Sequence, residues 1–179
     1  SFDKSLLPKK KGKKLIDDKV KEFREKYKKD RKIYAINTNF RIKRYNFDTG
    51  WISSEGPFIE KLESGMASVC NRKHAFAVSN GSAALELAVQ AIGIGKGDEV
   101  LVPSNTFIAT WLAVSMCGAK PIPVEPNENT FNLDPKNIIK NITTRTKAII
   151  PVHLYGRSAD MPNINLIARK YGMFIIEDA

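Results

Sequence analysis

The sequence contains few cysteines. Cys70 and Cys117 are the only two in 179 residues, and they lie far apart, outside any CxxC or Cys/His spacing that would indicate a metal site. Two cysteines can form a pair, but so low a content in a chain of this size is typical of a reducing cytosol. We therefore expect a cytoplasmic protein without a metal site.

Long hydrophobic runs are also lacking. The longest apolar stretch covers residues 107–118 and is interrupted by Thr110 and Ser115. It is shorter than the ~20 residues that a membrane-spanning helix needs. No apolar segment follows the lysines near the N-terminus. We therefore expect neither a signal peptide nor a membrane span.

Basic residues outnumber acidic residues in the first 32 positions. Residues 1–32 contain 14 Lys and Arg against 6 Asp and Glu, so this segment carries most of the net charge of +10. Apolar residues between positions 15 and 27 recur at helical spacing, which predicts a short amphipathic helix over about residues 15–28. Its basic face suits nucleic acid or an anionic membrane, but charge runs are more often solvated. We favour a basic N-terminal extension or linker over residues 1–32, and consider a nucleic-acid partner unlikely.

From residue 33 onward the pattern is that of an α/β domain. Helical segments alternate with short β-branched runs, which predicts βαβ units and a mostly parallel sheet. Asp134 and Pro135 have the residue types of a helix N-cap and first turn. The last predicted strand is followed by no closing element, so we expect a domain truncated at its C-terminus, with that strand exposed. We expect helices at 57–69, 83–92, 107–117, 135–141 and 162–171, and strands at 74–78, 99–102, 120–124, 147–152 and 173–176.

A turn between a predicted strand and a predicted helix is the first candidate site. Gly81, Ser82 and Ala83 follow the strand at 74–78 and open the next helix. The free amides and the positive dipole end of a helix N-terminus bind anions, and these small residues leave room for a phosphate. Taken alone, the turn also fits an ordinary strand–turn–helix with a serine cap.

Three further residues stand next to strand ends. Asp178 follows an apolar strand, where a carboxylate can hold a protonated ring nitrogen, although an acidic residue there can equally be a cap or a metal ligand. Phe107 opens an apolar helix and can offer its flat face to a ring, but such an aromatic is usually part of the core. His153 follows the strand at 147–152, and we expect it to be structural rather than catalytic.

The amino-acid sequences of four segments, and their order along the chain, indicate a protein family more specifically than any single residue does. GWISSEGPFIEKLE, HAFAVSNGSAALELAVQAIGIGKGDEVLVPSNTFIATWLAV, TKAIIPVHLYGRSADM and YGMFIIEDA together resemble the DegT/DnrJ/EryC1/StrS family. Members of this family are fold-type I sugar aminotransferases that depend on pyridoxal 5′-phosphate (PLP). The resemblance covers about residues 45–179, and the wording around residues 50–59 is most similar to the GDP-perosamine synthase branch.

The resemblance implies a fold, a cofactor and a set of site residues. Residues 33–179 would be the N-terminal part of a large domain with three αβα layers and a mostly parallel sheet. Gly81, Ser82 and Ala83 would bind the PLP phosphate, Phe107 would stack on the ring, and Asp178 would pair with the pyridine nitrogen. The lysine that binds PLP covalently in the family has no counterpart here, since Lys147 opens a strand and Lys170 ends a helix. We therefore expect no catalytic residue in this chain, which by itself would be inactive.

The implied reaction is transfer of an amino group, from glutamate, to a 4-keto-6-deoxy nucleotide sugar in a homodimer. Within the family the alternative is a PLP-dependent sugar dehydratase, in which a histidine replaces the lysine. From another class, the alternative is a non-catalytic module that binds nucleic acid through residues 1–32. A dinucleotide-binding oxidoreductase fits poorly, because the turn at residues 79–82 lacks G-x-G-x-x-G.

Overall fold

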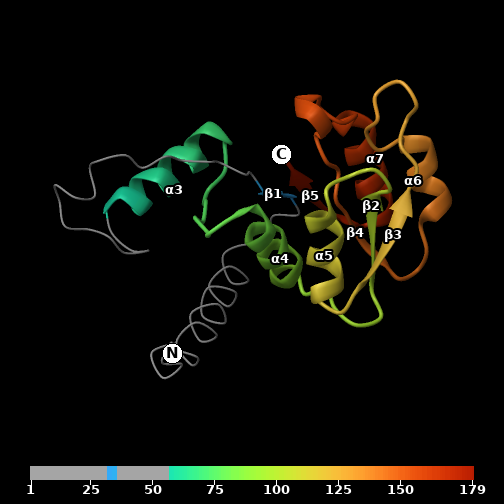
Figure 1. Cartoon of the computed structure of the whole chain (residues 1–179), viewed down its shortest axis with the longest axis horizontal. Helices are drawn as coiled ribbons and strands as arrows, with labels where there is room; N and C mark the ends of the chain where they lie inside the picture. The colour runs from blue at the N-terminus through green and yellow to red at the C-terminus, as the bar shows by residue number, and fades with distance from the viewer. Residues whose placement is uncertain (1–31, 36–56) are drawn as a thin grey trace, which may run out of the picture. The chain divides into compact units, whose positions relative to one another are not determined.

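The computed structural model describes residues 32–35 and 57–179, with side chains from residue 58 onward (Figure 1). The predicted basic helix at 15–28 and the segment at 45–56 lie outside the described residues. The chain divides into two compact units. One unit covers Asn37–Gly81, and the other joins Ser1–Ile36 to Ser82–Ala179.

The larger unit contains a sheet whose described strands are all parallel. The spatial order is β1-β5-β4-β2-β3, so the chain moves outward from β2 to β3 and then returns past β2 to β4 and β5. The predicted mostly parallel sheet is confirmed. The strands are β1 (Lys32–Ala35), β2 (Glu99–Pro103), β3 (Lys120–Val124), β4 (Thr146–Ile149) and β5 (Phe174–Asp178).

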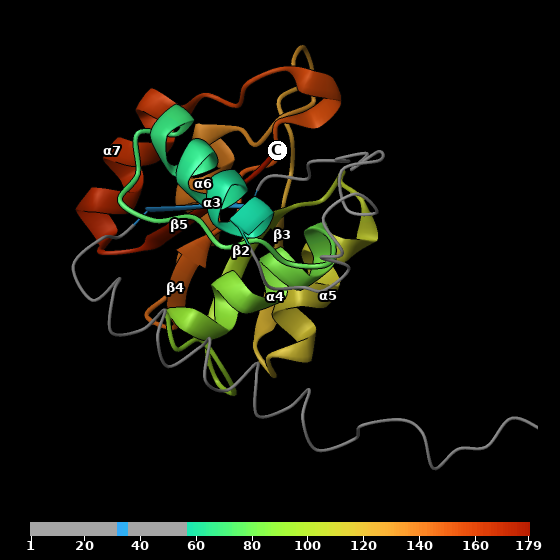
Figure 2. The ribbon, with the colours of Figure 1, turned by 90° about the vertical axis from the view of Figure 1, so that its left-hand side faces the viewer.

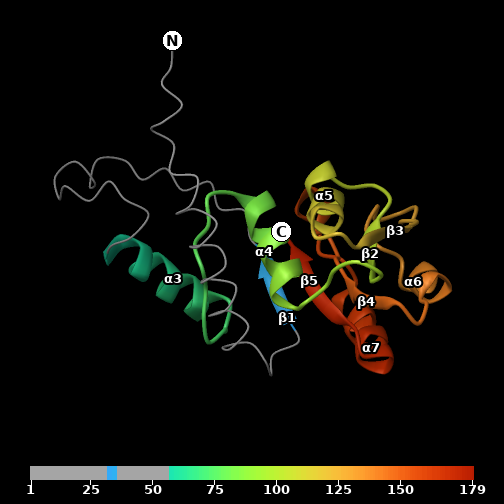
Figure 3. The same ribbon diagram turned by 90° about the horizontal axis from the view of Figure 1, so that it is seen from below.

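Helices cover both faces of this sheet. Seen from below, α5 lies over one face, and α6 and α7 lie over the other (Figure 3). This arrangement follows from the strand order, because right-handed crossovers running in opposite directions leave their helices on opposite faces. The predicted three-layer α/β architecture is confirmed. The described helices of this unit are α4 (Gly81–Ala91, whose first residue is counted with the smaller unit), α5 (Ile108–Met116), α6 (Pro135–Asn141) and α7 (Met161–Tyr171).

The core has two halves, one on each face of the sheet. Alternate residues of a strand point to opposite faces, so a sheet buried on both sides needs continuous apolar runs. All five residues of β2 are buried. Its central residue, Leu101, packs in one cluster with Ile138 of α6 and Ile164 of α7. By alternation, Val100 and Val102 face the side of α5.

The ends of α6 and α7 are set by local sequence signals. The Asp134 side chain accepts a hydrogen bond from the Lys136 amide at 2.9 Å, so the predicted cap is confirmed. Asp160 accepts one from the Asn163 amide at 3.3 Å and begins α7 in the same way. At the other end of α7, Gly172 adopts a left-handed conformation with φ of 69°, which terminates the helix.

The smaller unit contains α3 (Pro57–Val69), which has the predicted bounds. The strand predicted at 74–78 is wrong, because these residues pair with no described strand. The Ala77 amide donates instead to the Glu63 side chain at 2.8 Å.

The expectation of an exposed last strand is also wrong. β5 lies inside the sheet, hydrogen-bonded to β4 on one side and to β1 on the other. β1 was not predicted from the sequence, and it covers the edge that β5 would otherwise expose. At the opposite edge β3 carries Pro121 and Pro123, which lack an N–H group and so discourage pairing with a further strand.

No helix within the described residues is long and apolar enough to span a bilayer.

Both cysteines are free thiols. Cys117 lies within 3.9 Å of the Glu86 carbonyl oxygen, which links the end of α5 to α4.

A buried carboxylate secures the amino edge of the sheet. Glu99 is 3% exposed at the start of β2, and its Oε1 lies 2.6 Å from Arg145 Nη2. The Thr143 hydroxyl donates to its other oxygen. Hydrogen bonds from Thr143 and Arg145 hold the pKa of Glu99 below its ordinary 4.5, despite the opposing effect of burial.

Two adjacent isoleucines of α6 provide a matched test of the core. Ile138 is fully buried and Ile139 is 50% exposed. Ile138→Ala should lower the free energy of unfolding by about 2–5 kcal/mol, because it removes packed methyl groups and leaves a cavity. Ile139→Ala should change it by less than about 1 kcal/mol. Urea denaturation measures both values, and equal losses would contradict the assignment of the core.

The Glu99 cluster should make stability depend on pH. A carboxyl group whose pKa is lowered by folding stabilises the protein above its unfolded pKa, and this contribution is lost as the pH falls through the folded pKa. Glu99→Gln should therefore cost about 2 kcal/mol at pH 7 and progressively less below pH 4.5. Unfolding curves from pH 3 to 7 test this, with the exposed Glu128→Gln as control. A Glu99→Gln penalty that does not change with pH would contradict it.

Candidate functional site

The strand order creates a switch point between β2 and β4. From β2 the chain crosses to β3 with α5 on one face, and from β4 it crosses to β5 with α7 on the other. The loops that follow β2 and β4 therefore diverge at the carboxyl edge of the sheet. Ligands of open α/β sheets bind in the crevice that such divergence creates.

Phe107 lies in the loop that follows β2. It is the residue immediately before α5, in an extended conformation with φ of −67° and ψ of 141°. Its side chain is 75% exposed, so the expectation that an aromatic in this position belongs to the core is wrong. The following helix is fixed to the end of β2, because Trp111 Nε1 donates to the Pro103 carbonyl at 3.1 Å. Phe107 thus presents an exposed ring from a fixed backbone.

Asp178 is the last residue of β5 and is partly buried. Its Oδ2 accepts a hydrogen bond from the Thr110 hydroxyl at 2.8 Å. Thr110 lies in the first turn of α5, and its amide donates to the Phe107 carbonyl at 3.2 Å. Thr110 therefore links Asp178 to the start of α5, where Phe107 lies, although Asp178 and Phe107 are 71 positions apart in the sequence.

Opposing effects act on the Asp178 carboxyl group. Burial raises its pKa above the ordinary 3.8, whereas the hydrogen bond from Thr110 lowers it, and the net direction is upward. Ionised Asp178 thus lacks full compensation from the protein. A carboxylate of this kind is typical of a functional site, where a ligand supplies the missing positive partner.

His153 supports the neighbouring backbone. Its Nδ1 accepts a hydrogen bond from the Ala159 amide at 3.1 Å, so Nδ1 carries no proton and Nε2 does. Nε2 lies 3.3 Å from Glu177 Oε2. The His153 amide donates to the Asp178 carbonyl at 2.9 Å, which joins the loop after β4 to the end of β5. Both ring nitrogens are thus engaged in contacts that hold this loop, as a structural histidine requires.

Gly81, Ser82 and Ala83 form the first turn of α4. The other end of α4 is linked by residues 92–98 to the amino end of β2. The helix has 11 residues, a length of about 16 Å, which is similar to that of a five-residue strand. The middle of α4 is tied to the end of α5, where Cys117 Sγ lies 3.9 Å from the Glu86 carbonyl oxygen. α4 and α5 lie side by side in Figures 1 and 2.

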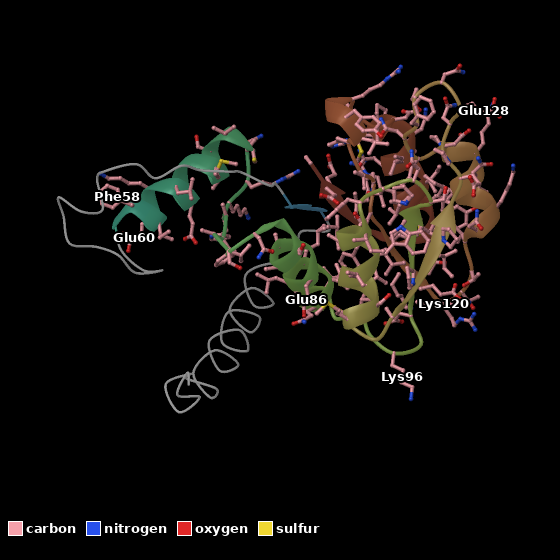
Figure 4. All side chains as sticks on the ribbon, in the orientation of Figure 1. Phe58, Glu60, Glu86, Lys96, Lys120 and Glu128 are labelled. Atoms are coloured by element: carbon pink, nitrogen blue, oxygen red, sulfur yellow. The ribbon has the colours of Figure 1, made fainter. Side chains whose placement is uncertain are left out.

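Several described lysines lie at the opposite edge. Lys96 precedes β2 and Lys120 opens β3, and Figure 4 shows both at the end of the sheet away from Glu128, which follows β3. Lys147 is the second residue of β4 and belongs to the same amino edge. Within the described part of the chain, no three His, Cys, Asp or Glu side chains are grouped so that they could hold a metal ion.

The carboxyl edge thus combines an exposed aromatic face with a partly buried carboxylate. These groups fit a protonated aromatic heterocycle: a planar ring stacks on Phe107, and a ring N–H pairs with Asp178. Sequence reasoning missed Thr110. The available signal was a hydroxyl one turn after Phe107, on the same side of an apolar helix as the buried Ala113 and Val114.

Several curated proteins are similar to most of this chain, and each of them is much longer than the chain. This chain is 52% identical over 132 residues to a GDP-perosamine synthase from Caulobacter vibrioides, and the match covers 74% of this chain and 36% of that protein. It is also 52% identical over 131 residues to dTDP-3-amino-3,6-dideoxy-alpha-D-galactopyranose transaminase from Aneurinibacillus thermoaerophilus, covering 73% of this chain and 36% of that protein. The chain thus spans about a third of the length of these relatives.

Solved structures are also similar to most of this chain. DesV from S. venezuelae, in complex with a ketimine intermediate, matches with a TM-score of 0.71 and 40% identity over 92% of this chain and 41% of DesV. NtdA from Bacillus subtilis, with the bound cofactor PMP, matches with a TM-score of 0.71 and 34% identity over 91% of this chain and 34% of NtdA. The family profile itself matches residues 39–179. The chain therefore belongs to the DegT/DnrJ/EryC1/StrS aminotransferase family.

Proposed function

We propose that residues 33–179 are the N-terminal part of the large domain of a PLP-dependent nucleotide-sugar aminotransferase, and that residues 1–32 are a basic extension. The complete enzyme would transfer an amino group from glutamate to the 4-keto group of a nucleotide-linked 6-deoxy sugar. The observation that carries this proposal is the partly buried Asp178 carboxylate, which is hydrogen-bonded to Thr110, the residue one helical turn after the exposed Phe107.

In this proposal Asp178 holds the ring nitrogen of the cofactor. When bound, PLP supplies an aromatic ring into which carbanion charge can delocalise, provided that the ring nitrogen is protonated. The negative charge of Asp178 favours the protonated nitrogen, and partial burial strengthens this interaction relative to water. The same pairing compensates the charge whose burial raises the pKa of Asp178.

Phe107 and the first turn of α4 orient the cofactor. The exposed Phe107 ring would lie against one face of the pyridine. Because the backbone of Phe107 is fixed, this contact would limit the tilt of the pyridine ring. Gly81, Ser82 and Ala83 would hold the phosphate at the positive end of the α4 dipole. The Ser82 side chain is exposed and adds a hydroxyl donor.

We propose that the lysine that binds the cofactor and moves the proton lies outside this chain. The position of Lys96, Lys120 and Lys147 at the amino edge supports this, because Asp178 lies at the carboxyl edge. The chain by itself would then bind the cofactor without catalysing transfer.

The substrate and assembly are proposals of the same kind. Relatives that act on GDP-linked and dTDP-linked sugars are equally similar, at 52% identity. We favour a GDP-linked sugar because of the wording around residues 50–59. We also propose a homodimer, which is supported by the family resemblance and by the exposed apolar residues Ile108, Leu112 and Met116 of α5. A cytoplasmic location is supported by the low cysteine content.

The complete protein that contains this chain should aminate a keto sugar nucleotide. With glutamate and a panel of GDP-, dTDP- and UDP-linked 4-keto-6-deoxy sugars, we expect an amino sugar from at least one of them. Asp178→Asn should lower the rate by about 10²–10⁴-fold, because the amide cannot stabilise a protonated ring nitrogen. Glu128→Gln, an exposed acid-to-amide change, is the control. Dehydration without amination would favour the dehydratase, and no reaction with any sugar would refute the proposed transfer.

The same substitution should stabilise this chain in the absence of cofactor. Since folding raises the pKa of Asp178, the folded state binds more protons than the unfolded state, and stability falls as the pH rises from 3.8 through the folded pKa. Asp178→Asn removes this loss, so the variant should gain stability relative to the parent at pH 7 but not at pH 3. Urea denaturation at the two pH values measures the difference. A variant that is less stable than the parent at pH 7 would contradict a net destabilising charge at this position.

A further inference from the structure

Thr110 is a buried hydroxyl on the apolar side of α5. It is 1% exposed and shares the buried side of α5 with Ala113 and Val114. A buried hydroxyl without a hydrogen bond is costly, so a threonine here needs a partner. The partner is Asp178, whose Oδ2 lies 2.8 Å from Thr110 Oγ1.

The direction of this hydrogen bond follows from the chemistry of the two groups. An ionised carboxylate only accepts hydrogen bonds, so the single proton of the Thr110 hydroxyl is donated to Asp178. Thr106 Oγ1 lies 3.2 Å from Thr110 Oγ1. Because the Thr110 proton is already used, Thr106 is the donor in this second bond. The two hydroxyls form a chain that ends on Asp178, in which each bond polarises the next.

The two oxygens of Asp178 differ in their surroundings. Oδ2 is held by Thr110, whereas Oδ1 receives no hydrogen bond from any residue that the structure describes. His153, in the loop after β4, bonds the main chain of Asp178 and not its carboxylate, because its amide donates to the Asp178 carbonyl at 2.9 Å. α5 therefore fixes one oxygen and leaves the other available to a ligand.

We propose that Thr110 is a positioning residue for the cofactor: by holding Asp178 Oδ2, it fixes the carboxylate so that Oδ1 pairs with the ring nitrogen of the PLP-type cofactor. This inference rests on the proposed function and adds a specific element to it. Thr110 does not touch the cofactor and acts through Asp178. The hydrogen bond also offsets part of the effect of burial, which favours the neutral acid.

The test uses this chain and pyridoxamine 5′-phosphate, a form of the cofactor without an aldehyde that could react with surface lysines. Thr110→Val removes the hydroxyl at nearly constant volume, and Thr110→Ser retains it. Ser115→Ala removes an exposed hydroxyl from the same helix and serves as control; this hydroxyl donates to the Trp111 carbonyl at 3.2 Å. If Thr110→Val does not fold cooperatively, Thr110→Ala takes its place, since the smaller side chain cannot clash.

Two quantities are measured for each variant. NMR titration of the Asp178 carboxyl carbon in the cofactor-free chain reports the hydrogen bond directly, and calorimetry gives the Kd for pyridoxamine 5′-phosphate. In Thr110→Val the pKa of Asp178 should rise, because the charged form loses a donor. The Kd should increase about tenfold, as expected for the loss of one hydrogen bond to a charged group. Thr110→Ser should restore both values to within about twofold in Kd, and Ser115→Ala should change neither.

The outcomes separate this inference from the proposed function. If the parent binds pyridoxamine 5′-phosphate and Thr110→Val matches it in both quantities, the positioning role is refuted and the proposed function stands. If the pKa rises but the Kd does not change, Thr110 bonds Asp178 without positioning it for the cofactor, and the inference is again refuted. If neither the parent nor any variant binds, this inference fails together with cofactor binding by this chain.

Discussion

The parallel hydrogen-bonding of the sheet is the constraint on which the rest of the site depends. Each described strand runs in the same direction, so every strand delivers its last residue to one edge. Parallel strands require crossover helices, and these cover both faces, which forces continuous apolar runs such as the fully buried β2. Polar residues at the carboxyl ends are therefore the positions at which such a sheet can present chemistry. Asp178 and His153 occupy two of these positions.

The two edges of the sheet use their charges in opposite ways. At the amino edge Glu99 is fully satisfied by Thr143 and Arg145, and its pKa is lowered, so its charge contributes to stability. At the carboxyl edge Asp178 receives one hydrogen bond, and its pKa is raised, so its charge opposes folding. The difference arises because burial is the largest effect on the pKa of Asp178, whereas hydrogen bonds from Thr143 and Arg145 are the largest effects on that of Glu99. An acid that the fold leaves incompletely satisfied, beside an exposed aromatic ring, is better explained by a ligand than by stability.

The site is assembled from layers on both faces of the sheet. α5 reaches Asp178 through Thr110, while the loop that leads toward α7 reaches the same residue through the His153 amide. Because successive residues of β5 point to opposite faces, Asp178 contacts α5 and Glu177 contacts His153. A shift of β5 by one residue would exchange the two carboxylates. The pairing of β5 with β4 and β1 therefore determines which acid is available to a ligand.

The sequence by itself determined the kind of fold and most of the helices and strands, and it proposed site residues. Periodicity located α3 with its observed bounds and placed β2, β3, β4 and β5 to within a few residues, because amphipathic patterns and caps such as Asp134 are local properties. The wording of long segments identified the family. The tertiary structure alone decided which residues meet. It rejected the strand at 74–78, added β1 at the edge of β5, exposed Phe107 and joined Thr110 to Asp178 across 68 residues. Strand pairing and long-range hydrogen bonds depend on partners far away in the chain, and no local pattern encodes them.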